Sequence, residues 1–179
     1  MEQSFGHYHG VSIKTGTNLL KFRQSGRVVF YEGLKDLAQM LETDSGEISV
    51  VKTLYQRISG LMEEDTLVVV DQLFMLSCLG LSDSAIYLLC HHLVSASLQQ
   101  CSSQIVLRLY LTDCDQLVNM VRRLGELHLS VTGLETGLSR DVSGVLSLLP
   151  PDGQSQTLHF KIMDKDVKMF GPGTSSAVL

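Results

Sequence analysis

Asp71 is the residue in this sequence with the clearest capacity for chemistry, because it ends a run of four apolar residues, Leu67 to Val70. An apolar run followed by an acid has the form of a Walker B strand. In P-loop nucleoside triphosphatases that carboxylate lies at the carboxyl end of a strand and helps to hold Mg²⁺. The pattern has low specificity, since any buried parallel strand that meets a loop can end in aspartate. It predicts a magnesium site only if a phosphate-binding loop accompanies it.

A phosphate-binding loop follows the pattern Gly-x-x-x-x-Gly-Lys-Ser/Thr, in which backbone N–H groups surround the phosphates and the lysine reaches them. The sequence of 179 residues contains no such run. Its glycine-rich stretches, residues 6–10 and 171–176, lack the Gly-Lys-Ser/Thr step. We therefore expect a chain that is not an enzyme and binds no cofactor. The alternative is a P-loop-type ATPase that uses Asp71.

Two histidine pairs could suggest a metal site, His7 with His9 and His91 with His92. The first pair lies in a glycine-broken segment. The second is adjacent on a predicted helix, so its rings point about 100° apart. Neither pair has a third ligand at a usable spacing, and we expect no metal.

The cysteines include no Cys-x-x-Cys pair, which argues against a zinc site and against a disulfide framework. Cys78 and Cys90 fall in apolar helical stretches, where a free thiol behaves as a small core residue. A structural role, without metal binding or disulfide formation, is the simplest interpretation of all four cysteines: Cys78, Cys90, Cys101 and Cys114.

The net charge of −5 does not favour a stand-alone nucleic-acid binder, because phosphate neutralisation requires clustered Lys and Arg. Two groups of cations are nevertheless candidates for RNA contact. One lies in a stretch without acids, and the other, which includes Lys168, alternates with Asp164 and Asp166. A solvated surface is the alternative for both groups. The candidates are Lys14, Lys21, Arg23, Arg27, Lys161 and Lys165, with Arg140 as a further one.

Apolar periodicity predicts strands and helices in alternation, followed by consecutive strands. The expected strands are residues 27–31, 66–71, 105–111, 127–132, 142–148, 157–163 and 167–170. Helices are expected from Gly33, over 48–62, over 83–98, and after the N-cap candidates Thr112 and Asp113. Glycines break any long helix within residues 5–26. Helix-separated strands pair in parallel, and short-looped strands add in antiparallel orientation.

The predicted fold class is therefore α/β, with a parallel sheet flanked by helices and an antiparallel, strand-rich C-terminal end. The length fits a single domain, residues 1–171, followed by a tail, residues 172–179. No apolar run approaches the roughly 20 residues that span a bilayer. The start of the chain also shows no signal-peptide pattern. The expected location is cytoplasmic, with the nucleus as a further one.

Five stretches of the sequence are distinctive: SFGHY (4–8), GRVVFYEGLK (26–35), LVVVDQL (67–73), GLETGLSRDVSGVL (133–146) and KIMDKDVKMFGPGTSSAVL (161–179). Together they resemble the Elongator complex protein 6 family, whose members are a small subunit of the tRNA-modification assembly Elongator. The match covers nearly the whole chain, and the stretch around Gly137, Arg140, Asp141 and Gly144 is its most specific part.

This resemblance implies a degenerate RecA-like fold and a hetero-hexameric ring with Elongator proteins 4 and 5. The ring binds tRNA, docks on the catalytic subcomplex and supports carboxymethyl-type modification of the wobble uridine. No small-molecule substrate and no membrane are implied. Gly137, Arg140, Asp141 and Gly144 become candidates for a subunit interface, with a hairpin turn closed by an Arg–Asp pair as the alternative.

Family members begin with further residues that carry a strand, a crossover helix and a second strand. We therefore expect this chain to lack that N-terminal part of the domain. Loss of a central strand exposes two sheet edges and part of the core. An inert, truncated fragment is accordingly a second alternative function.

Overall fold

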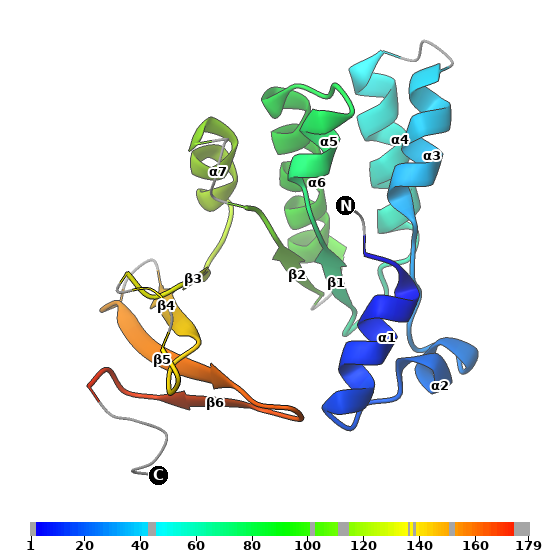
Figure 1. The fold of residues 1–179 in the computed structure, drawn as a ribbon. Helices are drawn as coiled ribbons and strands as arrows, with labels where there is room; N and C mark the ends of the chain where they lie inside the picture. Colours follow the sequence, from blue (N-terminus) through cyan, green and yellow to red (C-terminus); the bar gives the residue numbers. More distant parts are fainter. Residues whose placement is uncertain are drawn as a thin grey trace. The chain divides into compact units, whose positions relative to one another are not determined.

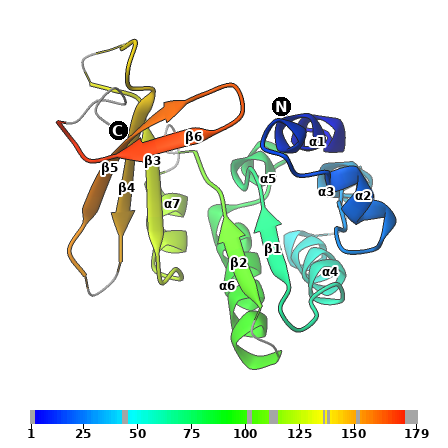
Figure 2. The ribbon, with the colours of Figure 1, turned by 90° about the horizontal axis from the view of Figure 1, so that it is seen from below.

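The computed structural model describes residues 3–42, 46–100, 103–110, 115–135, 137, 139–150 and 153–173. Figure 1 shows the fold as a ribbon, and Figure 2 shows it turned by 90°. Two compact units are present. One is Tyr31–Leu124, and the other joins Gln3–Phe30 to the residues from Gly125 onwards.

The unit Tyr31–Leu124 is an α/β arrangement built on two strands. β1 and β2 pair in parallel, with Leu67 opposite Gln104 and Val70 opposite Leu107. Within the described part of this unit, five helices connect or flank these strands, and Figures 1 and 2 show α6 beside β1 and β2. In chain order the elements are α3 (Gly33–Glu42), α4 (Glu47–Ser59), β1 (Leu67–Val70), α5 (Phe74–Cys78), α6 (Asp83–Gln100), β2 (Gln104–Leu107) and α7 (Asp115–Arg122).

The hydrophobic core of this unit lies between its helices and one face of β1 and β2. Side chains alternate along a strand, so Val70, Ile105 and Leu107 pack against the core while Leu67 and Val69 are exposed. Residues of the helices α3 to α7, and of the segments that connect them, form this core. Its most deeply buried side chains are Leu37, Val50, Leu73, Ile86, Leu89, Cys90, Leu93 and Leu117.

Ser82 fixes the start of α6 and ties it to α4. Its hydroxyl accepts a hydrogen bond from the Ala85 N–H at 3.3 Å, which satisfies an N–H group of the first turn. The same hydroxyl donates to Glu47 Oε2 at 2.7 Å, and the Ser82 N–H donates to Glu47 Oε1 at 3.0 Å. Glu47 stands in the first turn of α4, so one carboxylate joins the two helix starts.

The second unit contains two short helices and an antiparallel sheet. The helices are α1 (Phe5–Lys14), capped by Ser4, and α2 (Leu19–Gln24), capped by Asn18. The sheet has the order β3-β4-β5-β6, with every pair antiparallel. Its strands are β3 (His128–Thr132), β4 (Gly144–Leu149), β5 (Gln156–Ile162) and β6 (Val167–Phe170).

The predicted fold class is confirmed: parallel strands and helices come first, and an antiparallel sheet follows. Residues 174–179 of the predicted tail and the N-cap candidates Thr112 and Asp113 lie outside the described residues. Two compact units can be parts of one domain, so the single domain over residues 1–171 stays a prediction. Among the described residues, no helix is long and apolar enough to cross a membrane.

The predicted strand at residues 27–31 is wrong, because its backbone does not pair with a neighbouring strand in the described structure. The N–H groups of Arg27 and Val28 instead donate to the Phe22 carbonyl, at 2.9 and 3.2 Å. Among the apolar side chains of this segment, the Phe30 ring contacts the rings of Phe5 and Tyr8, whereas Val29 is exposed. Apolar β-branched residues specify burial, and an extended segment becomes a strand only where a partner takes up its hydrogen bonds.

Candidate functional site

The end of the parallel sheet holds the one acid that the sequence singled out. Carboxyl ends of parallel strands meet at the same edge, so Asp71 after β1 lies beside Arg108 after β2. Arg108 Nη1 donates to both carboxylate oxygens of Asp71, at 3.0 and 3.2 Å. Arg108 Nη2 also donates to the Tyr110 hydroxyl at 2.6 Å, and its guanidinium carbon lies 4.9 Å from the Tyr110 ring centroid. The ion pair balances the carboxylate charge with a cation of this chain.

The backbone around Asp71 holds this arrangement together. The Arg108 N–H donates to the Val70 carbonyl at 3.0 Å, and the Leu73 N–H donates to the Arg108 carbonyl at 3.2 Å. Gln72, between them, has a φ of 60°, a value that non-glycine residues adopt rarely. The side chain of Asp71 is 19% exposed. A divalent cation at this carboxylate would have to displace the arginine from a partly buried position.

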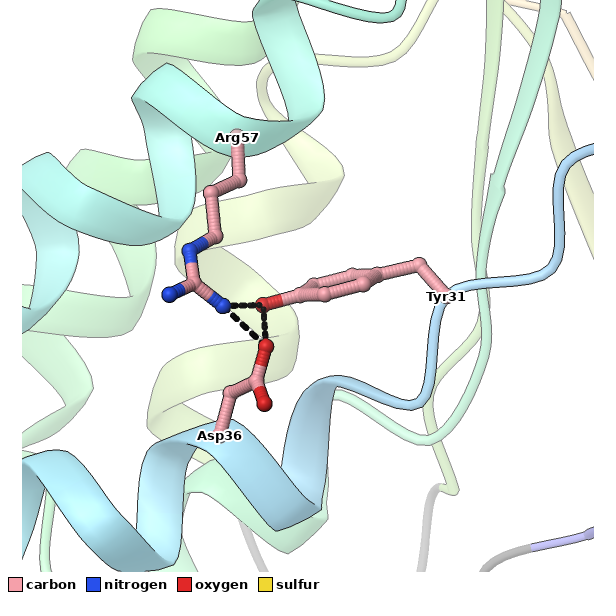
Figure 3. A network of polar contacts seen from close by, with 3 residues as sticks. All are labelled: Tyr31, Asp36 and Arg57. Atoms are coloured by element: carbon pink, nitrogen blue, oxygen red, sulfur yellow. Dashed lines mark hydrogen bonds and ion pairs between the residues drawn. The ribbon is translucent and has the colours of Figure 1, made fainter.

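A second polar network joins α3 and α4, and no pattern in the sequence predicted it. Figure 3 shows Tyr31, Asp36 and Arg57 converging on one another. The Tyr31 hydroxyl donates to Asp36 Oδ2 at 2.9 Å, and Arg57 Nη1 donates to the Tyr31 hydroxyl at 3.1 Å and to Asp36 Oδ2. Burial raises the pKa of the Tyr31 hydroxyl; the Arg57 hydrogen bond opposes this rise, and Asp36 adds to it. Arg57 is 26 positions from Tyr31 and 21 from Asp36, so only folding reveals the network.

The four interface candidates lie in the connection from β3 to β4 and at the first residue of β4. Gly137 has a φ of +88°, a conformation that favours glycine, and its N–H donates to the Leu134 carbonyl. Arg140 and Asp141 are exposed, and the ion pair of Asp141 is with Lys161 on β5, at 3.5 Å. Gly144 begins β4, where a Cβ atom would lie 2.5 Å from the Thr132 carbonyl oxygen and 2.7 Å from the Phe160 ring. Close packing therefore accounts for Gly144, and an interface role for the others stays a prediction.

The RNA-contact candidates fall on two parts of one unit. Lys14, Lys21 and Arg23 lie on α1 and α2, Arg27 follows α2, and all four are exposed. Arg23 stacks on the Phe5 ring, with its guanidinium carbon 4.6 Å from the ring centroid. In the sheet, Lys165 and Lys168 are exposed, as is the further candidate Arg140, while Lys161 is half-buried beside Asp141. All of these cations except Lys161 are accessible, and none of them is shown to contact RNA.

The histidine pairs take part in ring contacts. His9 stacks on Phe5, and His7 contacts Tyr8 edge to face. His91 and His92 contact each other and the rings of Tyr87 and Tyr55 on α6 and α4. Within the described ranges, no three His, Cys, Asp or Glu side chains are grouped as a metal site would require.

Cys78 and Cys90 are free thiols, and Cys101 and Cys114 lie outside the described residues. Cys90 is fully buried in α6, as expected of a core residue, whereas Cys78 is exposed. Burial raises the pKa of the Cys90 thiol to about 12.

Comparison with known proteins assigns the family. The family model described as Elongation complex protein 6 matches residues 1–164 of the chain. The chain belongs to this family. A relative named Elongator complex protein 6 from Danio rerio is 32% identical, with 99% of this chain and 79% of the relative covered. Relatives of that name from Mus musculus and Homo sapiens are each 29% identical, with the same coverage.

Among solved structures, a KaiC-like protein from Pyrococcus horikoshii resembles the chain in fold. The TM-score is 0.58 at 9% sequence identity, covering 94% of this chain and 73% of that chain. At this identity the likeness concerns the fold alone, and it agrees with the RecA-like α/β class. In this member of the Elongation complex protein 6 family, the carboxylate with the Walker B pattern is that of Asp71, and it forms an ion pair with Arg108.

Proposed function

We propose that this chain is a non-catalytic subunit of the Elongator complex. In this proposal it forms a hetero-hexameric ring with Elongator proteins 4 and 5, through which it reaches the catalytic subcomplex. The ring binds tRNA and supports carboxymethyl-type modification of the wobble uridine, in the cytoplasm and also in the nucleus. The observation that carries the proposal is the family match over residues 1–164, together with relatives whose printed name is Elongator complex protein 6.

The chemistry at Asp71 supports the non-catalytic part of the proposal. A Walker B carboxylate must be available to a magnesium ion. Here the carboxylate accepts two hydrogen bonds from Arg108, which is itself anchored by Tyr110. The arginine supplies the positive charge that the ion would otherwise bring. Surfaces, rather than reacting groups, are therefore the expected means by which the chain acts.

Co-expression with Elongator proteins 4 and 5, followed by measurement of particle mass by light scattering, tests the assembly. We expect a particle of six subunits that contains this chain. A full-length relative, such as the Danio rerio protein, serves as the positive control for incorporation. A particle that forms with the control but excludes this chain contradicts the proposal.

The ATPase alternative has its own test in the same particle. Asp71→Asn should leave any ATP hydrolysis by the ring unchanged, because the carboxylate of Asp71 serves an ion pair and not a metal ion. The matched variant Asp83→Asn changes a carboxylate at the start of α6, in the same unit. Loss of turnover with Asp71→Asn, but not with Asp83→Asn, would support the ATPase.

A further inference from the structure

The segment of residues 3–30 carries positive charge and contains no acid. Its four cations are Lys14, Lys21, Arg23 and Arg27, and it has no Asp or Glu. All four cations are exposed. The chain as a whole has a net charge of −5, so the sign of the charge is reversed in this segment. Clustered cations without acids attract anionic partners. We call residues 3–30 the cationic segment.

The cationic segment folds as α1 and α2, which lie beside each other in Figures 1 and 2. Lys14 is the last residue of α1, and Gly16, with a φ of +85°, turns the chain between the two helices. Lys21 and Arg23 lie in the last turn of α2, and Arg27 follows that helix. All four cations are therefore at helix ends or just beyond them.

The cations of this segment are available to a ligand. Within the described ranges, none of the four forms an ion pair with an acid. Arg23 is held over the Phe5 ring, 4.6 Å from its centroid, and an arginine positioned in this way loses less freedom when it binds a phosphate. Lys14 lines a hollow with Asp164 and Lys165. An acid therefore lies near Lys14, and the other three cations carry the proposal.

The second group of RNA-contact candidates, which lies between residues 140 and 168, has one acid for each cation. Lys161 pairs with Asp141 at 3.5 Å. A phosphate that approaches this group meets equal numbers of positive and negative charges, so the net attraction is small. The cations are Arg140, Lys161, Lys165 and Lys168, and the acids are Asp141, Asp152, Asp164 and Asp166.

We propose that the cationic segment is the part of this chain that contacts the phosphate backbone of RNA, and that the second group does not contact it. Neutralisation of phosphates requires cations that no acid opposes, and residues 3–30 meet this requirement. The inference rests on the proposed function, in which the assembled ring binds tRNA. It adds the surface of this chain that touches the RNA.

An anionic membrane is a different partner for exposed cations, and the pattern of α1 does not favour it. Helices that lie on a membrane have one apolar face opposite a charged face. Val11 and Ile13 are 51% and 49% exposed. They are two positions apart, which is about 200° around the helix axis, so the apolar residues form no single stripe. RNA is therefore the partner that the cationic segment fits better.

Two double variants, matched in charge, test the inference in the co-expressed particle. Lys21→Gln with Arg27→Gln removes two charges from the cationic segment. Lys165→Gln with Lys168→Gln removes two charges from the second group. Light scattering first measures the incorporation of each variant, which should equal that of the wild type. Fluorescence anisotropy of labelled tRNA over a series of salt concentrations then measures binding.

The variant of the cationic segment should bind tRNA about ten-fold more weakly at roughly 0.1 M salt, because each lost phosphate contact removes counterion release. Its plot of log affinity against log salt concentration should also be shallower, by about 1 to 2. The variant of the second group should bind like the wild type. Helix-end lysines that serve only α2 would leave both quantities unchanged.

Ultraviolet cross-linking of tRNA to the wild-type particle gives a second readout that requires no substitution. Peptides of this chain that carry cross-linked nucleotide, identified by mass spectrometry, should come from residues 3–30. Cross-links confined to other parts of the chain contradict the inference.

The outcomes separate this inference from the proposed function. If the wild-type chain is not incorporated, or if the particle binds no tRNA, both fail. If the particle binds tRNA and both double variants bind equally well or equally weakly, only the inference fails. It is also overturned if the variant of the cationic segment is excluded from the particle, since its cations then serve a protein contact. The same holds if that variant keeps its tRNA affinity but loses binding to vesicles of equal parts phosphatidylcholine and phosphatidylserine.

Discussion

The side chains of Arg108 and Tyr110 determine what the carboxylate of Asp71 can do. Strands that end in aspartate occur both in metal-binding sites and in purely structural ones. The residue that follows the neighbouring strand distinguishes the two, because it lies beside the carboxylate. Here that strand ends in arginine, which donates twice to Asp71. The pair is partly exposed, so its contribution to stability is at most about 1 kcal/mol. Its main effect is to occupy the carboxylate.

The two described cysteines should differ sharply in reactivity. The pKa of the Cys90 thiol is about 12, so almost none of it is thiolate at pH 8, and the thiolate is the nucleophile. Alkylation of the native protein at pH 8, followed by mass spectrometry, should modify Cys78 and leave Cys90 unmodified. Both should react in denaturant. Modification of Cys90 in the native protein at the rate of Cys78 would show that α6 is not buried as described.

Tyr31 should give the chain a pH dependence in the alkaline range. Its pKa is raised above 10.0 in the folded protein, so its contribution is fully present below pH 10 and is lost as the pH rises through the folded-state value. Tyr31→Phe should cost at most about 1 kcal/mol at pH 8, because the hydroxyl is only half-buried. Denaturant unfolding from pH 8 to pH 11 measures both effects. The difference between the wild type and Tyr31→Phe should shrink at the highest pH, and a constant difference would contradict the assignment.

Among the secondary-structure elements, the β3–β4–β5 arrangement depends on the absence of a side chain at Gly144. Phe160 lies opposite Gly144 in the register, and its ring occupies the space that a Cβ would need. Glycine is usually unfavourable within strands, so its presence indicates a close approach. The family-specific stretch around Gly144 therefore contains at least one residue that packing explains.

Gly144→Ala should destabilise the antiparallel sheet by about 1–3 kcal/mol, because the new methyl group clashes with the Thr132 carbonyl and the Phe160 ring. Gly133→Ala is the matched control, since a Cβ there meets nothing within 4 Å. Hydrogen exchange of the β4 and β5 amides measures the effect. Equal protection in the two variants would mean that the sheet tolerates the methyl group.

For the whole molecule, the division into two compact units predicts that they lose structure separately. The large apolar core cluster is built from residues 31–124, and the sheet β3–β6 lies in the other unit. Chains with more than one compact unit often depart from two-state unfolding. A substitution in this core should therefore speed the hydrogen exchange of amides in the unit Tyr31–Leu124 more than that of amides in the sheet β3–β6.

Leu89→Ala tests this separation. Leu89 is 1% exposed on α6, and its truncation should cost about 2–5 kcal/mol. Its neighbour Leu88 is 38% exposed, so Leu88→Ala is a control in the same helix with a much smaller expected cost. Hydrogen exchange should show faster exchange in α4 and α6 with Leu89→Ala and unchanged exchange in β4. Equal acceleration in β4 would show that the two units unfold together.

The sequence by itself determined the fold class, most of the secondary structure and the family. Apolar periodicity follows the way side chains alternate in helices and strands, so α3, α4, α6 and the strands β1, β3, β4, β5 and β6 lie close to where the pattern predicts them. The missing phosphate loop and the family-specific stretches are also properties of the sequence alone. Interface and RNA-contact residues stay predictions, because their function depends on partners.

Tertiary structure decided what depends on contacts between distant residues. The pattern of residues 27–31 predicts a strand, but the N–H groups of Arg27 and Val28 donate to the Phe22 carbonyl, and the Phe30 ring contacts that of Phe5. Asp71 has only the form of a Walker B carboxylate in the sequence, and folding brings Arg108, 37 positions away, to that carboxylate. A residue pattern indicates which side chains are apolar, and only the tertiary structure shows which residues each of them contacts.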